Sequence, residues 1–192
     1  MTELEQYLRS YMSINDEDMR ILTSYFHPTT LEKGDYFLKA GRVCDKLSFH
    51  RSGLMRVYTE YYDKEVTQWL SFKGNLIADI NGIVSDRPAL YSIQALTRSD
   101  LYTISKKDYN NLAQHVPNWL ALERVLIARC FGFMEQRIFA MLAMPAEQQY
   151  QYLLGINPDF NQVPLKYLAS MMGITPESLS RVRNKLAAHP VQ

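Results

Sequence analysis

The possible folds are limited most by a long helical run at residues 117–144. At 1.5 Å per residue this helix would be roughly 40 Å long, which is unusual for a chain of 192 residues. Its apolar side chains fall on nearly every side of the helix, so one side can pack on the rest of the chain and another needs a partner. They are Leu122, Val125, Leu126, Ile127, Phe131, Phe133, Ile138 and Phe139. A second copy of the same helix is the simplest partner, so the run predicts a homodimer.

The same run is too charged to cross a membrane. Glu123, Arg124, Arg129, Glu135 and Arg137 interrupt it, and spanning helices rarely contain that many charges. The N-terminal sequence MTELEQYLRS is amphipathic and acidic, whereas a signal peptide begins basic and then becomes apolar. We therefore expect a soluble, cytoplasmic protein that has no membrane partner.

Residues 30–104 predict a compact antiparallel β body. Short runs rich in Val, Ile, Tyr, Phe and Thr alternate there with glycines at intervals suited to turns. Residues 54–59 and 65–72 are expected to form a hairpin, and further strands are expected at 91–96 and 100–104.

A second well-marked feature is the sequence GITPESLSRVRNKL at residues 173–186. Thr175 can cap a helix through its hydroxyl, and Pro176 suits the first helical position. An apolar stripe then faces one way and a polar face the other. The stripe consists of Leu179, Val182 and Leu186. The preceding helical pattern at 164–172 ends at Gly173, so the order is helix, glycine turn and capped helix. In this helix-turn-helix layout the second helix contacts base edges in the DNA major groove.

Charge near the C-terminus supports contact with DNA. The whole chain has a net charge of only +1, so any affinity for phosphates must come from a local patch. Residues 163–192 supply one, with Lys166, Arg181, Arg183 and Lys185 against the single acid Glu177. The candidate DNA-binding residues are Lys166, Thr175, Glu177, Ser178, Ser180, Arg181, Asn184 and Lys185. The competing interpretation is a helical pair with a purely structural role.

The remaining patterns complete an α+β architecture. Residues 2–12 and 16–26 are typical of two packing helices, with Asn15 or Asp16 as the cap of the second. We expect N-terminal helices and a jelly-roll-like β-roll, then a long helix and a helical bundle. The predicted parts are a sensor domain at 1–116, a dimerisation helix at 117–144 and a helix-turn-helix domain at 145–192.

Metal, cofactor and catalytic chemistry find little support. Cys44 and Cys130 lie far apart and form no CxxC motif, which argues against a zinc module or a disulfide scaffold. The histidines are scattered, with no acid at ligand spacing. They are His27, His50, His115 and His189. We therefore expect no metal, no cofactor and no enzymatic activity.

The order of β-roll, long helix and KYLASMMGITPESLSRVRNKL resembles the Crp/Fnr family of transcription regulators over almost the whole chain. The most specific part is LA(x)3GIT(x)E(x)LSR(x)R, preceded by PAEQQYQYLLGINPDFNQVPLKYLA. The resemblance implies a homodimer that binds double-stranded DNA, with an effector-binding β-roll and with RNA polymerase as a further candidate partner. By position, Glu177 and Arg181 match the acidic and basic base-contacting residues of the family. The candidate dimer interface consists of Leu122, Val125, Leu126, Arg129 and Phe133.

Two C-terminal features depart from the family pattern. Pro176 stands where cAMP-responsive members commonly have a basic residue, so one base contact is expected to be lost or replaced. The family's wing hairpin should follow Leu186, yet only AAHPVQ remains. We therefore expect little or no wing contact with DNA. A small-molecule or protein-binding sensor that has lost DNA binding is the alternative function.

The β-roll departs from the family more strongly. Cyclic-nucleotide-binding members hold the cyclic phosphate with an Arg-Ser pair, and Ala89 and Leu90 occupy those positions here. Asp79 stands where the family's glutamate meets the ribose. Arg87 is either a solvated loop charge, which is the favoured interpretation, or a weak substitute for the missing cation. We therefore expect no response to cAMP. The candidate residues for a pocket that holds some other effector are Trp69, Asp79, Tyr91, Arg129 and Phe133.

Overall fold

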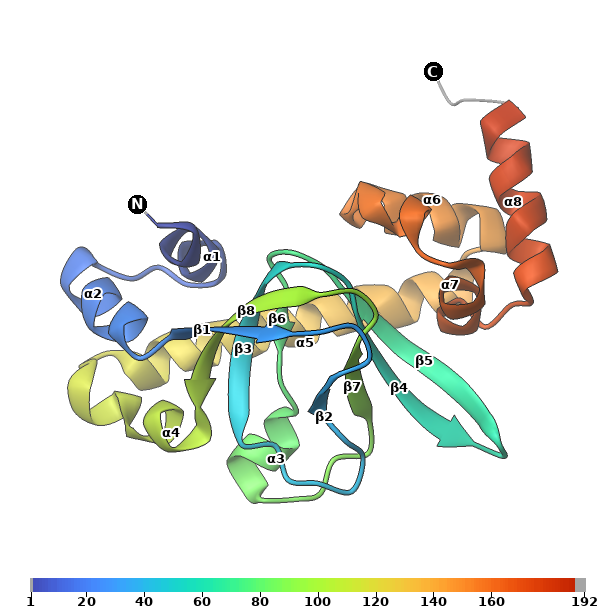
Figure 1. Cartoon of the computed structure of the whole chain (residues 1–192). Coiled ribbons are helices and arrows are strands. Elements are labelled where there is room, and N and C mark those ends of the chain that lie inside the picture. The colour runs from blue at the N-terminus through green and yellow to red at the C-terminus, as the bar shows by residue number, and fades with distance from the viewer. Residues whose placement is uncertain (1, 189–192) are drawn as a thin grey trace.

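The computed structural model describes residues 2–188 and begins with two capped helices (Figure 1). Helix α1 (Glu3–Tyr11) has Thr2 as its N-cap, and the side chain of Glu5 accepts the Thr2 backbone N–H at 2.7 Å. Helix α2 (Asp16–Ser24) has Asn15 as its N-cap. Of the two predicted cap candidates, Asn15 and Asp16, Asn15 is therefore the N-cap.

The β body is a roll of two four-stranded sheets. The strand orders are β1-β8-β3-β6 and β2-β7-β4-β5, and all pairs are antiparallel. The strands are β1 (His27–Leu31), β2 (Tyr36–Leu38), β3 (Lys46–Ser52), β4 (Met55–Tyr61), β5 (Lys64–Ser71), β6 (Leu76–Ile77), β7 (Ser92–Ala95) and β8 (Ser99–Ser105). The short helix α3 (Ile80–Ser85) connects β6 to β7. The predicted α+β class with an antiparallel roll is confirmed.

The predicted hairpin is formed by β4 and β5 and has a tighter turn than expected. Tyr61 pairs with Lys64, so only Tyr62 and Asp63 make the turn. Both have left-handed backbone angles, with φ of 46° and 58°. Such a turn matches the right-handed twist of the flanking strands, although the sequence lacks the asparagine and glycine that usually mark it.

The chain continues through a helical region that crosses behind the roll and ends beside it (Figure 1). The elements are α4 (Lys106–His115), α5 (Trp119–Ala143), α6 (Ala146–Ile156), the 3-10 helix η1 (Pro158–Gln162), α7 (Leu165–Met171) and α8 (Pro176–Ala188). No helix within residues 2–188 is long and apolar enough to span a membrane. The predicted loss of the wing concerns residues that lie partly outside the described ones, because 189–192 are not described.

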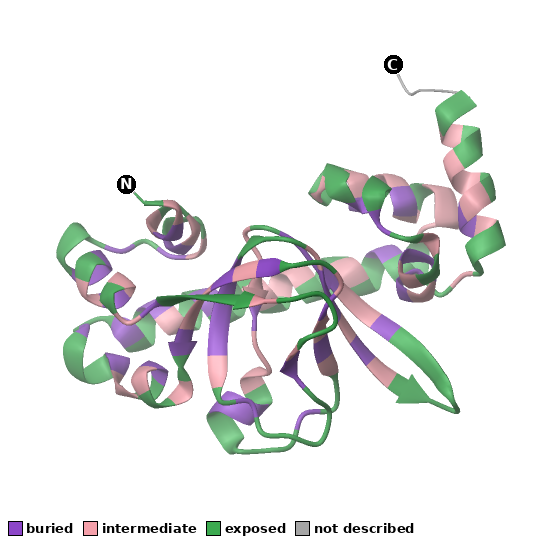
Figure 2. Cartoon of the chain, in the orientation of Figure 1, coloured by how far each residue is buried: buried purple, intermediate pink, exposed green. Residues whose placement is uncertain are grey.

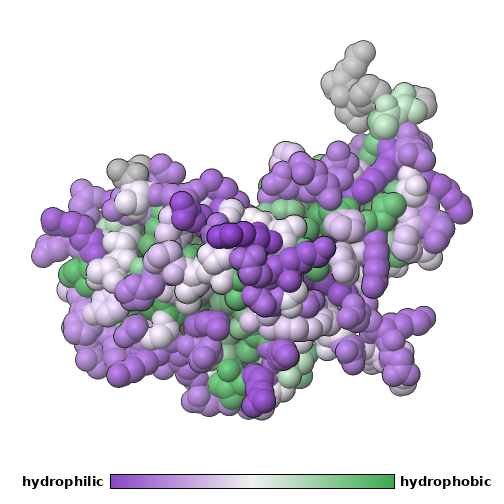
Figure 3. Space-filling model, viewed as in Figure 1, coloured by the Kyte–Doolittle hydropathy of each residue, from purple (hydrophilic) through white to green (hydrophobic). Residues whose placement is uncertain are grey.

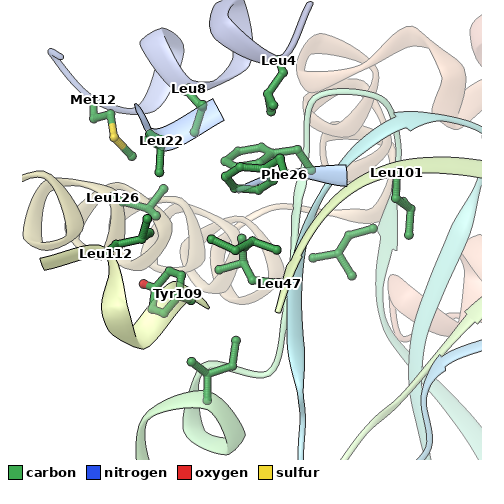
Figure 4. Packing of buried hydrophobic residues seen from close by; sticks show 14 of the residues in the cluster. Leu4, Leu8, Met12, Leu22, Phe26, Leu47, Leu101, Tyr109, Leu112 and Leu126 are labelled. Carbon is green, nitrogen blue, oxygen red and sulfur yellow. The ribbon is translucent and has the colours of Figure 1, made fainter. Parts of the chain in front are cut away.

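Two hydrophobic clusters hold these elements together. The first joins α1, α2, α4 and α5 to the roll, and Figure 4 shows Leu8, Leu22 and Leu126 converging there from different helices. The second joins β5 to the C-terminal helices through Leu70 and Phe160. The C-terminal helices therefore pack directly on the β-roll. The face of the molecule seen in Figure 3 is largely hydrophilic, with hydrophobic side chains visible between the C-terminal helices.

The orientation of α5 differs from the one expected. The predicted dimer interface includes Leu122 and Leu126, but these residues are 8% and 2% exposed and belong to the first cluster. Phe133 faces Trp69 at a ring-centre distance of 5.3 Å. Several apolar side chains of α5 are exposed, among them Val125 of the predicted interface, and six of them line up in a seam, which we call the α5 seam. It consists of Leu120, Ile127, Phe131, Met134, Ile138 and Met141. From Ile127 to Met141 these residues alternate at four and three positions, as in a heptad repeat, and Leu120 lies one full heptad before Ile127.

His50 on β3 is a histidine inside the fold. The residue is 0% exposed, and its Nδ1 lies 3.1 Å from Oγ of Ser71. Because burial disfavours the charged imidazolium, the pKa of His50 falls from 6.5 to about 4. His50 is therefore a packing residue, as the absence of ligand spacing suggested.

This buried histidine should make the protein less stable in mild acid. Between pH 6.5 and pH 4 the unfolded chain binds a proton at His50 that the folded chain does not, so stability falls as the pH falls. From pH 7.5 to pH 5 the loss should be about 2 kcal/mol, measured by urea unfolding at both values. His50→Asn should remove most of this pH dependence, while His27→Asn, at an exposed histidine, should keep it. Equal pH dependence in all three proteins would contradict this explanation.

Candidate nucleic-acid interface

The turn between α7 and α8 has the geometry that a helix-turn-helix needs. Gly173 has φ of 67°, in the left-handed region that glycine adopts without strain. The N–H of Ile174 donates to the carbonyl of Ala169 at 3.1 Å, which closes the end of α7 as in a Schellman motif. The hydroxyl of Thr175 then accepts the N–H of Ser178 at 3.2 Å. The predicted glycine turn and the predicted Thr175 cap are both present.

Helix α8 has one anchored side and one free side (Figure 2). Leu179 is 0% exposed, and Val182 and Leu186 pack against the second cluster. The free side carries most of the candidate DNA contacts. Thr175, Glu177, Arg181, Asn184 and Lys185 are exposed, and Ser178 and Ser180 are half-buried. Lys166 is exposed on α7. These candidate residues therefore share a surface that a ligand can approach.

The exposed surface of α8 carries one acidic and two basic side chains. Hydrogen bonds from its own backbone N–H and from Thr175 lower the pKa of Glu177, so this carboxylate is ionised. Arg181 lies four residues further along α8, so the two side chains are neighbours on the helix. Lys185 forms an ion pair with Glu147 of α6 at 2.5 Å. The surface therefore offers an acceptor, the Glu177 carboxylate, beside the fork of donors on Arg181.

Arg183 does not belong to this surface, although it adds to the local positive charge. Its Nη2 donates to the carbonyl oxygens of Phe160 and Val163, at 3.1 Å each. Its guanidinium lies 5.5 Å from the ring centre of Tyr150. Arg183 therefore fastens α8 to the segment that contains η1. Sequence charge alone could not separate this inward arginine from the outward Arg181.

The candidate effector-pocket residues lie in separate surroundings. Trp69 and Phe133 meet edge to face, and the guanidinium of Arg137 lies 3.9 Å from the Trp69 ring centre. Arg129 donates to the carbonyl of Ser10 in α1. Tyr91 lies in the loop before β7 and is 37% exposed. The structure thus brings together only Trp69 and Phe133, in a junction that is filled by other side chains.

Asp79 and the loop before β7 are the part of the roll that the resemblance compares with the family's cyclic-phosphate site. Asp79 precedes α3, and a Cβ at Gly82 would lie 2.9 Å from its Oδ2 and from Cβ of Cys44. Ala89 is 5% exposed, and its N–H donates to the carbonyl of Arg42 at 2.9 Å. Arg87 is exposed, as expected of a solvated loop charge. Ala89, which the resemblance places at the family's arginine position, is thus a buried small residue.

Comparisons with known proteins agree with this architecture. Residues 28–116 match the family model of the cyclic nucleotide-binding domain. The comparison with curated proteins found no match. Among solved structures, the chain is similar to FixK2 from Bradyrhizobium japonicum, with 15% identity, 85% of each chain covered and a TM-score of 0.69. Structural likeness at such identities establishes the fold.

Two other solved structures cover still more of the chain. One is a putative transcriptional regulator of the crp/fnr family from Eubacterium rectale, with 15% identity, 91% of this chain and 84% of that chain covered, and a TM-score of 0.67. The other is the catabolite activator protein of Thermus thermophilus, with 20% identity, 96% and 88% covered, and a TM-score of 0.57. Residues 28–116 thus match the model of the cyclic nucleotide-binding domain, and the chain as a whole shares its fold with solved Crp/Fnr-type transcription regulators.

Proposed function

We propose that the protein is a cytoplasmic, sequence-specific DNA-binding transcription regulator that acts as a homodimer. The observation that carries this proposal is the free side of α8. Glu177, Arg181 and Asn184 are exposed on a helix whose other side is anchored by the buried Leu179. A recognition helix needs this combination, because its polar side must enter the major groove while its apolar side holds it on the protein.

The chemistry of this side suits direct contact with base edges. The Arg181 guanidinium can donate two bonds to O6 and N7 of a guanine, and the Glu177 carboxylate can accept from N4 of a cytosine. The Asn184 amide suits an adenine. Thr175, Ser178 and Lys166 are proposed to contact the phosphate backbone, so they would fix orientation and carry little sequence information. The proposed half-site therefore contains G·C pairs opposite the start of α8.

The α5 seam supports the dimer. Leu120, Phe131 and Ile138 are 65%, 60% and 54% exposed in one chain, and such a stripe is costly to leave in water. Its heptad spacing suits an identical helix packed alongside. Pairing two chains along α5 would present two copies of α8 to a two-fold-symmetric site. The recognition helices would then enter successive major grooves about 34 Å apart.

The proposed regulator should not respond to cAMP. A cyclic phosphate brings a negative charge into a partly buried site, and Ala89 supplies no cation there. Loss of one charge-assisted bond should weaken binding by at least about tenfold. Titration calorimetry with cAMP at micromolar concentrations should therefore give no heat. Micromolar binding that also tightens DNA binding would contradict this and would point to Arg87 as a replacement cation.

The alternative is a sensor module with no affinity for DNA. A gel shift with DNA from upstream of the protein's own gene separates the two functions. The proposed function predicts a discrete complex that survives competitor DNA at physiological salt, because specific binding commonly exceeds non-specific binding by about 10³-fold or more. A sensor module would give no shift at any protein concentration.

A further inference from the structure

The helix-turn-helix covers an open edge of the β-roll. β5 is the last strand of its sheet, so the outward N–H groups on this edge need partners from elsewhere. Helix α7 packs against β5 (Figure 1). The N–H of Thr67 on β5 donates to Oγ of Ser170 on α7 at 2.9 Å, and Thr67 is 3% exposed. Helix α7, the first helix of the helix-turn-helix, therefore covers this edge of the sheet.

A buried arginine lies at this contact. Arg56 on β4 is 2% exposed, its Nη1 donates to Oε2 of Glu65 at 2.6 Å, and its Nε donates to Oγ1 of Thr67 at 2.9 Å. Its guanidinium lies 4.3 Å from the ring centre of Tyr58 and 4.5 Å from that of Tyr167. Tyr58 belongs to β4 and Tyr167 to α7. The guanidinium therefore contacts the β-roll and the helix-turn-helix at once.

This arrangement fixes an orientation more than it adds stability. Removing a guanidinium from water is costly, and a buried ion pair is often no more stabilising than well-packed apolar residues. An apolar side chain could fill the same space among the aromatic rings and could slide against them. The fork of Arg56 is planar and its hydrogen bonds are directional, so only one placement of Tyr167 over it preserves both kinds of contact.

The orientation of α7 determines that of α8. Leu168 on α7 and Leu179 on α8 are both 0% exposed and lie in the same cluster, so the two helices move together. Docking on β5 leaves Arg181 and Asn184 exposed, so the docked state keeps the reading side free. We propose that Arg56 is a positioning residue for DNA binding, which holds α7 at one angle on β5 and so sets the tilt and separation of the two recognition helices. The proposal rests on the proposed function.

The test replaces Arg56 with Met, which keeps the length of the side chain and removes its charge and fork. Arg56→Met should remain folded and dimeric. For the DNA site that the wild-type protein selects, its affinity should fall by at least about tenfold. The matched control is Arg20→Met, because Arg20 is an exposed arginine on α2 and lies far in sequence from the contact between β5 and α7. This variant should bind DNA as the wild-type protein does.

Spacing preference distinguishes positioning from a general weakening. Sites with one base pair added or removed between the half-sites should bind the wild-type dimer much more weakly. Arg56→Met should lose less on these altered sites, because its recognition helices are no longer held at one separation. Tyr167→Leu should have the same effect, and combining it with Arg56→Met should add little. Tyr167→Phe keeps the ring and should resemble wild type.

Hydrogen exchange of the free protein gives a readout that does not depend on DNA. Peptides covering β5 and α7 should exchange faster in Arg56→Met by about tenfold, while those covering β3 and β8 should not change. Unchanged affinity and spacing preference alongside faster exchange would overturn the positioning role and leave the proposed function intact. If the wild-type protein selects no DNA, the proposed function fails and the positioning role fails with it. Unchanged exchange in Arg56→Met would show that Arg56 does not hold α7.

Discussion

Replacing Phe131 with Asp is expected to convert the dimer into monomers and to abolish binding to a two-fold-symmetric DNA site. Phe131 lies in the middle of the α5 seam and is 60% exposed in one chain, so pairing along the seam would bury it. Each dimer would then bury two carboxylates without partners, at a cost of about 3 to 5 kcal/mol for each. Sedimentation equilibrium should give the mass of one chain, with an unchanged far-ultraviolet circular dichroism spectrum.

Two further Asp variants on the same helix show whether the position matters. Gln136 is exposed outside the seam, so Gln136→Asp should remain dimeric. Leu122 is buried within one chain, so Leu122→Asp should lower the thermal stability of the fold itself. A dimeric mass for Phe131→Asp would place the interface elsewhere on the protein.

Replacing Arg181 with Ala should weaken specific DNA binding by about 1 to 3 kcal/mol, which is roughly 5-fold to 150-fold. The loss should be accompanied by relaxed preference at one base pair in each half-site, because the guanidinium is the proposed reader of a guanine. The measurement is a binding titration against the selected site and against all substitutions of each half-site position.

Lys166→Ala is the matched control for loss of a positive charge. Lys166 is exposed on α7 and is proposed to contact a phosphate. Its loss should weaken binding evenly across sequences and should lower the salt dependence by about one phosphate contact per protomer. If Arg181→Ala also weakened all sequences evenly, Arg181 would be a backbone contact and its assignment as a base reader would be wrong.

Local signals were sufficient to predict the helix-turn-helix. A hydroxyl three residues before a backbone N–H makes the Thr175 cap, and a glycine with φ of 67° makes the turn at Gly173. Both depend on residues within one turn of helix, so the chain reveals them without any tertiary contact. The same reasoning located the hairpin of β4 and β5, although the left-handed Tyr62 carried no turn signal.

The orientation of elements could not be predicted in the same way. Helix α5 is apolar on nearly every side, so its sequence has no polar stripe to show which apolar residues face the roll, and Leu122 and Leu126 were misplaced. Arg183 and Arg181 are both basic and lie two residues apart, but only the folded structure shows that Arg183 points inward while Arg181 is exposed. The contact of Arg56 with Tyr167 joins residues more than a hundred positions apart, and no periodicity reports it.

The residues that line an effector pocket could not be predicted from the sequence for a related reason. Trp69 and Phe133 are candidates for lining a pocket, but aromatic side chains at such positions are more often part of the core. Here Trp69 packs against Phe133 and Phe160 and supports the junction of β5 with the C-terminal helices. Whether a residue lines a cavity depends on what surrounds it in space, which sequence spacing does not specify.

Sequence-specific DNA binding is tested by selecting duplexes from a random pool with the wild-type protein and sequencing them. The proposed dimer should enrich a two-fold-symmetric site whose half-sites are centred about 34 Å apart and contain G·C pairs that Arg181→Ala no longer prefers. A folded, dimeric protein that enriches no sequence above the starting pool would contradict sequence-specific DNA binding.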